Sequence, residues 1–261
     1  MRTIRPVIHP KLIEPQLSLD ENLVVDLDGQ LRVHPKIRIN AVLIGRERSP
    51  ALIIDDFLAD PDVLIDYATR HCAYEAVSNT FYPGIRAPIP PIYSFAVRSF
   101  VGPAIGKAFG LPAADVLREL SHFSLVTTPP EKLKGPQRIP HLDNTNPKQL
   151  AILHYLCGPQ FGGTSFYRHR RTGFESIDDA RSADFGRGLK ADYDAFGPPP
   201  ARYICNEDAR YERIASFPAA LNRVLVYRSM SLHSADIPVD FSFDSNPRTG
   251  RLTANTFFFY R

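Results

Sequence analysis

The stretch Pro140-His141-Leu142-Asp143 decides how this chain is interpreted. Side chains of an extended segment alternate between two faces, so His141 and Asp143 point the same way if the segment is a strand. Pro140 disrupts strand pairing and marks the edge of that strand. Together with His233, far downstream, the segment offers two imidazoles and one carboxylate. On one face of a metal ion, this donor set leaves three coordination positions open and is typical of Fe(II).

The His-x-Asp pattern is weak evidence by itself. In chains of this length and composition, about 0.5 such patterns are expected by chance. A histidine that caps a loop, followed by an aspartate that starts a turn, explains His141 and Asp143 equally well. The sequence around them therefore has to decide between the two interpretations.

The composition fits one large β domain, since 261 residues with 44% hydrophobic content can bury a substantial core. A net charge of +3, from 31 basic and 28 acidic residues, is too balanced to predict nucleic-acid binding. The cysteines Cys72, Cys157 and Cys205 are widely spaced, which fits a reducing compartment and gives no zinc motif. The sequence contains no apolar signal segment and no run of membrane-spanning length. We expect a soluble, cytoplasmic protein without a nucleic-acid or membrane partner.

The first part of the chain predicts β structure followed by helices. Asp28-Gly29, after the apolar run 23–27, predicts a hairpin with Ile37–Ile44, and Ala51–Phe57 is typical of a buried strand. Asp60 and Pro61 predict the start of a helix that runs to about residue 71.

A second, largely helical stretch is expected from Ser94 to about Leu120, interrupted by Gly110 and Pro112. Residues 82–92, which precede it, are too rich in proline for regular structure. A rigid loop of this kind either lines a pocket or simply connects two elements at the surface.

The second half of the chain predicts strands around a polar interruption. The expected strands are Phe123–Thr127, Leu150–Leu156, Thr164–Tyr167, Arg223–Tyr227 and Leu252–Tyr260. Residues 169–215, with a helix near 178–185, are too poor in apolar residues to hold a core alone, so they are interpreted as an insertion. We expect a single domain, made of an N-terminal β extension (1–50), helical support (51–120), a β core (121–168 and 216–261) and the insertion (169–215).

Five features follow one another in a fixed order along the chain. They are the His141-x-Asp143 pair, the Tyr155-Leu156 strand, the Gly162-Gly163 turn, the distal His233, and an arginine, Arg251, at the start of the last strand. This series resembles the 2-oxoglutarate- and Fe(II)-dependent dioxygenases, and within them the prolyl-hydroxylase-like branch, as a bacterial subfamily of it. The resemblance covers residues 121–171 and 219–260.

The resemblance implies a mainly β fold with flanking helices (α+β), namely a double-stranded β-helix of the jelly-roll or cupin-like kind. It implies that His141, Asp143 and His233 are the metal ligands and catalytic residues. Arg251 would hold the distal carboxylate of the co-substrate 2-oxoglutarate, since a planar guanidinium suits bidentate pairing. Arg248, three residues earlier in a Pro-Arg-Thr-Gly turn, competes for this role. The spacing from His233 to Arg251 is also wider than the family usually shows.

Other residues are expected around the same site. Tyr155 occupies the place of a phenol that hydrogen-bonds the co-substrate carboxylate in the family, although it also fits a core aromatic. Thr253 and Asn255 share the strand parity of Arg251 and are expected to face the pocket. By the same alternation His154 points away from the pocket and is interpreted as structural.

Three further residues, Asn144, Arg228 and Arg86, are candidates for contacts around the metal or with the substrate.

The activity implied by the resemblance is oxidative decarboxylation of 2-oxoglutarate with O2, coupled to hydroxylation of a small-molecule or peptide substrate. An aspartate at position 143 argues against halogenation, since halogenating members usually have a small residue there. Two alternatives remain at this point. One is a non-catalytic protein that binds a small ligand or partner on the same barrel. The other is a cupin-type metal enzyme without a ketoacid, which usually brings more histidine ligands.

Overall fold

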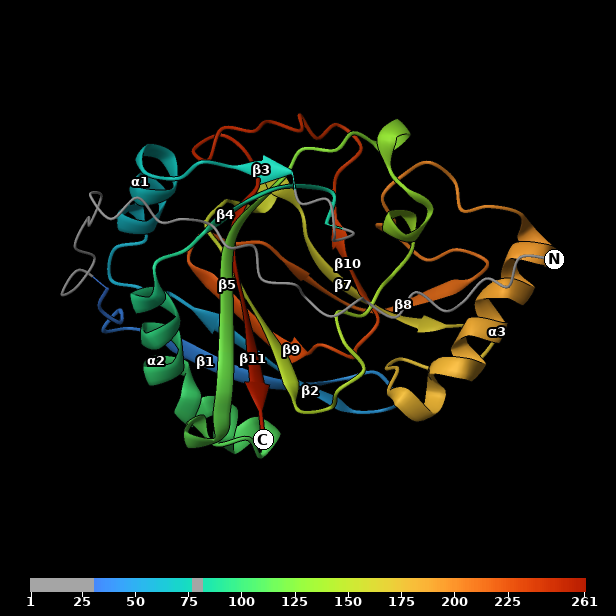
Figure 1. The fold of residues 1–261 in the computed structure, drawn as a ribbon, viewed down its shortest axis with the longest axis horizontal. Helices are drawn as coiled ribbons and strands as arrows, with labels where there is room; N and C mark the ends of the chain where they lie inside the picture. Colours follow the sequence, from blue (N-terminus) through green and yellow to red (C-terminus); the bar gives the residue numbers. More distant parts are fainter. Residues whose placement is uncertain (1–30, 77–81) are drawn as a thin grey trace.

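The computed structural model describes residues 31–76 and 82–261 (Figure 1). The hairpin predicted at Asp28-Gly29 lies outside the described residues. Within them the chain forms mostly antiparallel β structure with a few helices, and the mainly β class predicted from the sequence is confirmed. None of the helices in this part of the chain is long and apolar enough to cross a membrane.

The helices of the described residues are α1 (Asp62–Arg70), α2 (Pro91–Phe109) and α3 (Asp179–Phe196), with short 3-10 turns between other elements. The strands are β1 (Arg38–Ile44), β2 (Ser49–Asp55), β3 (Glu75–Ala76), β4 (Gly84–Pro88), β5 (Val116–Val126), β6 (Gln149–Tyr155), β7 (Gly163–His169), β8 (Tyr211–Pro218), β9 (Arg223–Arg228), β10 (His233–Asp236) and β11 (Leu252–Tyr260).

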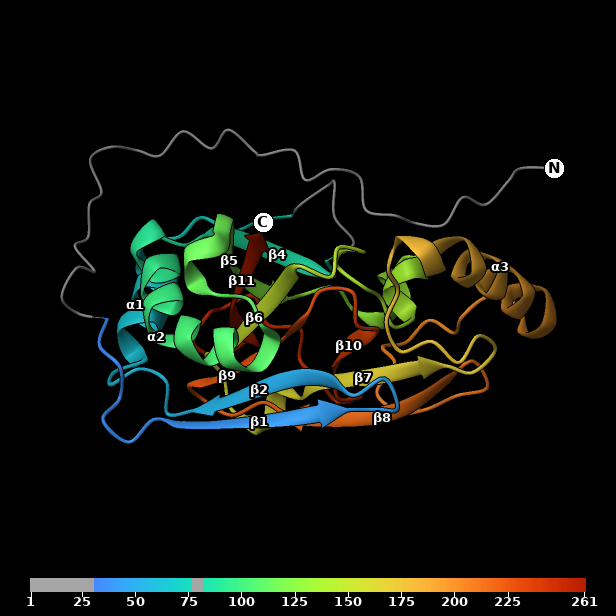
Figure 2. The same ribbon diagram turned by 90° about the horizontal axis from the view of Figure 1, so that it is seen from below.

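The strands form two sheets. The large one has the order β1-β2-β9-β6-β11-β5-β4-β3, and the small one has the order β10-β7-β8. A bridge between His141 and His233 adds the segment before β6 to the free side of β10. Figure 2 shows β7 and β8 on one side of the molecule and β4, β5 and β11 on the other, with α1 and α2 at one end and α3 at the opposite end.

The connectivity is that of a double-stranded β-helix, as predicted. From β5 to β11 the chain passes back and forth between the sheets, so that β5, β6, β9 and β11 lie in the large sheet. The His141 segment, β7, β8 and β10 lie in the small one. Two sheets wound in this way enclose a space between them, and one face of each central strand lines it.

The main core lies on the other face of the large sheet. Even-numbered residues of β11, Leu252, Ala254 and Phe258, are fully buried there against α2 residues such as Val97 and Val101. The odd-numbered residues of β11 consequently face the space between the sheets. The alternation of side chains along β11 therefore separates the structural core from the candidate site.

The predicted helix over residues 94–120 is correct only in its first part. Helix α2 ends at Phe109, where Gly110 takes a left-handed conformation with φ of 69°. The prediction of a helix is wrong for residues 116–120. They form the first half of β5 and pair with β11 from Phe257 to Tyr260. Pairing with this aromatic strand end outweighs the local helical preference.

The expectation of irregular structure at residues 82–92 is also wrong. Gly84–Pro88 forms β4 and pairs with β5, and α2 begins at Pro91. The prolines lie at the ends of these elements, where a missing N–H does little harm. Gly84 is required by close packing, because a Cβ at this position would overlap the carbonyl oxygen of Leu125.

The interruption between β7 and β8 contains more regular structure than predicted. Helix α3 extends to Phe196, and the carboxylate of its N-cap Asp178 accepts a hydrogen bond from Arg181 N. Strand β8 already begins at Tyr211, inside the range assigned to the insertion. The organisation as a single domain with an insertion stays a prediction.

Replacing Phe258 by alanine is expected to lower the free energy of unfolding by about 3–5 kcal/mol, because this fully buried ring would leave a cavity. Phe95, which is 54% exposed on α2, is the matched control, and its replacement should change stability by less than about 0.5 kcal/mol. Urea unfolding of both variants measures the difference. Equal losses would contradict the assignment of the core.

Candidate metal centre

The structure brings the three predicted ligands together. One ligand atom from each of His141, Asp143 and His233 lies within 4.8 Å of the others. Nε2 of His141 is 3.9 Å from Asp143 Oδ1, and Nε2 of His233 is 3.6 Å from Asp143 Oδ2. These separations place two imidazole nitrogens and a carboxylate around one point, as a divalent ion requires.

Backbone hydrogen bonds set this geometry. His141 N donates to His233 O, and His233 N donates to His141 O, each over 2.9 Å. Asp143 N donates to Ser229 O over 2.8 Å. The His141 segment thus forms a single bridge rather than the strand that the sequence predicted, and both of its ligands are tied to the chain around β10.

The cluster fits a cation by its protonation. Nδ1 of His233 lies 2.9 Å from Ser231 O, and because a carbonyl only accepts, Nδ1 carries the proton. In the neutral ring, Nε2 then presents a lone pair toward Asp143. Asp143 Oδ2 is itself buried and accepts no hydrogen bond from the described residues. Two facing acceptors without a proton between them repel one another, and a metal ion would satisfy both.

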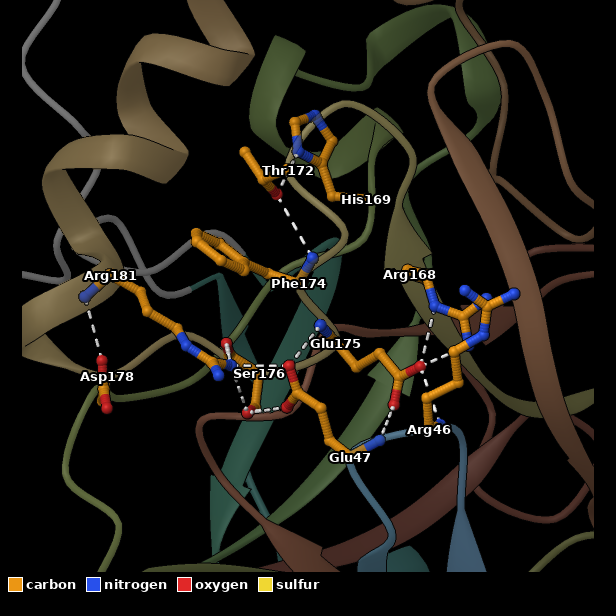
Figure 3. A network of polar contacts seen from close by, with 10 residues as sticks. All are labelled: Arg46, Glu47, Arg168, His169, Thr172, Phe174, Glu175, Ser176, Asp178 and Arg181. Atoms are coloured by element: carbon orange, nitrogen blue, oxygen red, sulfur yellow. Dashed lines mark hydrogen bonds and ion pairs between the residues drawn. The ribbon is translucent and has the colours of Figure 1, made fainter.

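A buried polar network supports the segment that carries His233 (Figure 3). Arg168, on β7, donates to Glu175 Oε1 from Nε over 2.8 Å and from Nη2 over 2.5 Å. Glu175 also accepts the backbone N–H groups of Arg46 and Glu47, each over 3.0 Å. Its own carbonyl oxygen accepts the N–H of Leu232 over 2.8 Å, directly before His233.

A second carboxylate closes this network. Glu47 accepts hydrogen bonds from Ser176 Oγ and, over 2.6 Å, from Arg181 on α3 (Figure 3). Gly45 makes the arrangement possible, because it has a φ of 64° and a Cβ there would overlap the Glu175 carboxylate. The β1–β2 turn, α3 and the His233 segment are thereby joined through side chains whose charges are paired.

The cluster opens into a cavity of about 500 Å³ between the two sheets. Its volume is within the usual range for small-molecule sites. The side chain of His141 is 46% exposed and that of His233 only 6%, so the cluster lies where the cavity meets solvent. Of the predicted co-substrate residues, Arg251, Thr253 and Asn255 line the cavity, and Tyr155 does not.

Arg251 is buried and held from two sides. Nε donates to Phe161 O over 3.1 Å and Nη2 to Gly163 O over 2.9 Å, while the guanidinium lies 5.6 Å above the ring of Tyr155. Its Nη1 makes no hydrogen bond with another described residue. Arg248, the competing candidate, is partly exposed and pairs with Asp66 on α1, away from the cavity.

The remaining predicted residues take different positions. The hydroxyl of Tyr155 is 2.6 Å from Thr164 Oγ1, and Thr164 rather than Tyr155 reaches the cavity. Asn255 donates to Ser124 Oγ over 3.3 Å and leaves its Oδ1 buried without a partner among the described residues. Asn144 also lines the cavity.

Two predicted residues lie outside the cavity. Arg228 donates to the carbonyl oxygens of Pro147 and of Phe109, at the end of α2. His154 is buried between Tyr93 and Asn222, and burial lowers its pKa to about 4, so it is a neutral structural residue as predicted.

Three tyrosines that the sequence did not single out, Tyr82, Tyr203 and Tyr227, line the cavity. Tyr227 lies 4.8 Å from the His233 ring, and burial followed by the nearby charge of Asp143 raises its pKa well above the usual value. Its inward direction follows from strand parity, which the predicted strand 223–227 already contained. Tyr82 and Tyr203 lie in stretches without a regular alternation of apolar and polar residues, so the direction of their side chains could not be predicted.

The fold is thus a double-stranded β-helix with two histidines and one carboxylate at the mouth of its cavity. This chain belongs to a family of unknown function, DUF6445, whose model it matches over residues 35–258. Among curated proteins, none matches the chain.

Three solved structures are weakly similar to this chain. AviO1 from Streptomyces viridochromogenes Tue57 is 13% identical over 85% of this chain and 89% of its own, with a TM-score of 0.41. SnoK, a non-heme alpha ketoglutarate dependent carbocyclase from nogalamycin biosynthesis, is 13% identical over 82% and 83%, with a TM-score of 0.45. HygX from Streptomyces hygroscopicus, solved with nickel, 2-oxoglutarate and hygromycin B, is 10% identical over 83% and 88%, with a TM-score of 0.42. At such low similarity, the site residues themselves have to carry any functional conclusion.

Metal binding tests the cluster directly. We expect the protein to bind one equivalent of Co(II) or Fe(II). Loss of a residue that only hydrogen-bonds a metal ligand weakens metal binding by about 10–100-fold, and His233→Ala should weaken it by more than that. His71→Ala, at an exposed histidine outside the cluster, is the control and should bind like the unchanged protein. Calorimetric titration measures both. Equal affinity of the two variants would show that the cluster is not the metal site.

The support network predicts a pH dependence of stability. Burial raises the pKa of Glu175, but hydrogen bonds from the backbone of Glu47 and Arg46 and from Arg168 lower it by more than burial raises it. The pKa of Glu175 is therefore below its usual value. A carboxylate of this kind contributes stability above its unfolded pKa of about 4.3, and the contribution is lost as pH falls.

Glu175→Gln is therefore expected to be less stable near pH 7 but to lose less stability than the unchanged protein between about pH 5 and pH 3. Glu207→Gln, at an exposed ion pair with Arg170, is the control and should follow the unchanged protein. Denaturant unfolding at each pH gives the curves. Parallel curves for Glu175→Gln and the unchanged protein would contradict a stabilising role for this carboxylate.

Proposed function

We propose that the protein is a 2-oxoglutarate- and Fe(II)-dependent dioxygenase that hydroxylates a small-molecule or peptide substrate. The observation that carries the proposal is that the His141, Asp143 and His233 cluster and the buried Arg251 open into one cavity. A metal ligand set that leaves positions open and a buried cation for a dicarboxylate are the two elements that this chemistry needs.

In the proposal, His141, Asp143 and His233 hold the metal. An iron ion bound there would supply oxidative decarboxylation of 2-oxoglutarate with O2, coupled to oxidation of a substrate C–H bond. Ser231 O keeps His233 in the tautomer that can ligate, and Ser229 O fixes the backbone of Asp143. These contacts hold the open geometry before any ligand arrives.

Arg251 binds the distal carboxylate of 2-oxoglutarate in the proposal. Two backbone carbonyls and the ring of Tyr155 orient its guanidinium, so little conformational entropy is lost when a carboxylate pairs with it. Burial strengthens the pair because the local dielectric constant is low. Thr253 and Asn255, on the same strand, supply polar groups toward the same ligand, and Tyr155 acts through Arg251 rather than by direct contact.

Placement in the prolyl-hydroxylase-like branch and hydroxylation as the outcome stay predictions. The aspartate at position 143 supports hydroxylation over halogenation. The aromatic side chains that line the cavity, including Tyr227 and Phe257, help to exclude water from the reacting groups.

Anaerobic addition of Fe(II) and 2-oxoglutarate tests the proposed function. We expect a weak visible charge-transfer band that needs both ligands and disappears in His233→Ala. Arg251→Ala should keep metal binding but weaken 2-oxoglutarate, because the buried carboxylate loses its cation. Arg248→Ala, at the exposed arginine nearby, is the matched control and should behave like the unchanged protein.

Absence of the band in folded, iron-loaded protein would contradict the proposal and favour a binding protein on the same barrel. Unchanged 2-oxoglutarate affinity in Arg251→Ala would overturn the role of Arg251 alone.

A further inference from the structure

A second arginine of the cavity, Arg86, is partly buried and lies on β4, the strand next to the edge of the large sheet. Arg86 lies on β4 and pairs in register with Ser124 on β5, which pairs with Thr253 on β11. Residues in register on neighbouring strands share a face, so Arg86 is on the same side as Thr253. Both line the cavity.

The guanidinium of Arg86 has no anionic partner in the described part of the chain. It lies 4.3 Å above the ring of Tyr82, and its Nε is buried without a hydrogen-bond partner. No described carboxylate lies within the 4.0 Å of a salt bridge. Arg168 and Arg251, by contrast, each donate at least two hydrogen bonds, Arg168 to carboxylates and Arg251 to backbone carbonyls.

The buried Nε of this cation is costly, because it has lost water and gained no hydrogen bond. Burial accordingly lowers the pKa of Arg86, while Tyr82 and Asp143 raise it in part. His122, another titratable neighbour, adds no second positive charge, since burial and then Arg86 lower the pKa of His122 to about 4. The site is therefore prepared for a negative group.

Once the cavity holds a metal and 2-oxoglutarate, its net charge allows one further negative group. A divalent metal, Asp143, a 2-oxoglutarate dianion and Arg251 together carry no net charge. Arg118 also lines the cavity but is exposed and lies over the ring of Phe259 at the rim. Among the described residues that line the cavity, Arg86 is then the partly buried charge that remains uncompensated.

We propose that Arg86 binds a carboxylate of the primary substrate, so that the substrate of this cavity is a carboxylic acid. The inference rests on the proposed function, because it assigns Arg251 to the co-substrate. One guanidinium left over after the other charges of the loaded cavity cancel matches a monoanion, and its planar fork suits a carboxylate. A phosphate dianion would need a second cation or a row of free backbone N–H groups, and the backbone of β4 is paired with β5.

Phenylacetate is a suitable probe, because Tyr82, Tyr203 and Phe257 give the cavity aromatic walls. Phenylacetamide is its neutral counterpart of the same shape. Both are titrated into protein loaded with Ni(II) and 2-oxoglutarate, which holds the site without turnover, and binding is followed by calorimetry and ligand-observed NMR. The unchanged protein is expected to bind the acid at least about 10-fold more tightly than the amide.

Arg86→Gln should remove this preference, Arg86→Lys should keep part of it, and Arg248→Gln should keep all of it. The proposal is overturned if the unchanged protein shows no preference for the acid, or if folded Arg86→Gln retains the preference. It is also overturned if Arg86→Gln loses the anaerobic Fe(II)–2-oxoglutarate band, since Arg86 would then serve the co-substrate. Absence of that band in the unchanged protein is a different result, which contradicts the proposed function.

Discussion

The reciprocal backbone hydrogen bonds between His141 and His233 are the constraint on which the candidate site depends. They join two segments that are distant in the sequence, and they bring two imidazoles and the neighbouring Asp143 carboxylate to one point. A hydrogen bond between Nδ1 of His233 and Ser231 O leaves Nε2 to face the Asp143 carboxylate. The paired charges of Arg168 and Glu175 support the His233 segment from behind. The side chains that support the His233 segment and those that would bind a ligand thus lie on opposite sides of one short stretch of chain.

The two faces of the large sheet likewise have different roles, one in packing and the other in lining the cavity. On one face, Phe258 and its neighbours pack against α2 and hold the fold. On the other face, Arg251, Thr253 and Asn255 come from the same strand and line the cavity. A strand that is rigid because one face is densely packed holds polar groups on its other face in fixed positions, as a site for a charged ligand requires. Arg86 extends this polar face to the edge of the sheet.

Much of this arrangement could be predicted from the sequence, because it depends on strand periodicity and on residue order. The resemblance carried by the order of the five motifs implied the β-helix and the three clustered residues, and strand alternation indicated the inward direction of Arg251. Residues 116–120 could not be predicted, since their strand forms only against the aromatic end of β11. The strand at Gly84–Pro88 was hidden by its prolines, and with it the inward direction of Arg86. Tyr155 shows a further limit of prediction from sequence. Strand alternation gives the direction of its side chain, but it does not show that Thr164 lies between Tyr155 and the cavity.

The most direct measurement is a crystal structure of the protein grown anaerobically with Fe(II) and 2-oxoglutarate, with anomalous diffraction recorded at the iron edge. One anomalous peak is expected at His141, Asp143 and His233, with the ketoacid extending from the metal to Arg251. A peak at other residues, or an empty cluster with 2-oxoglutarate bound elsewhere, would contradict this expectation.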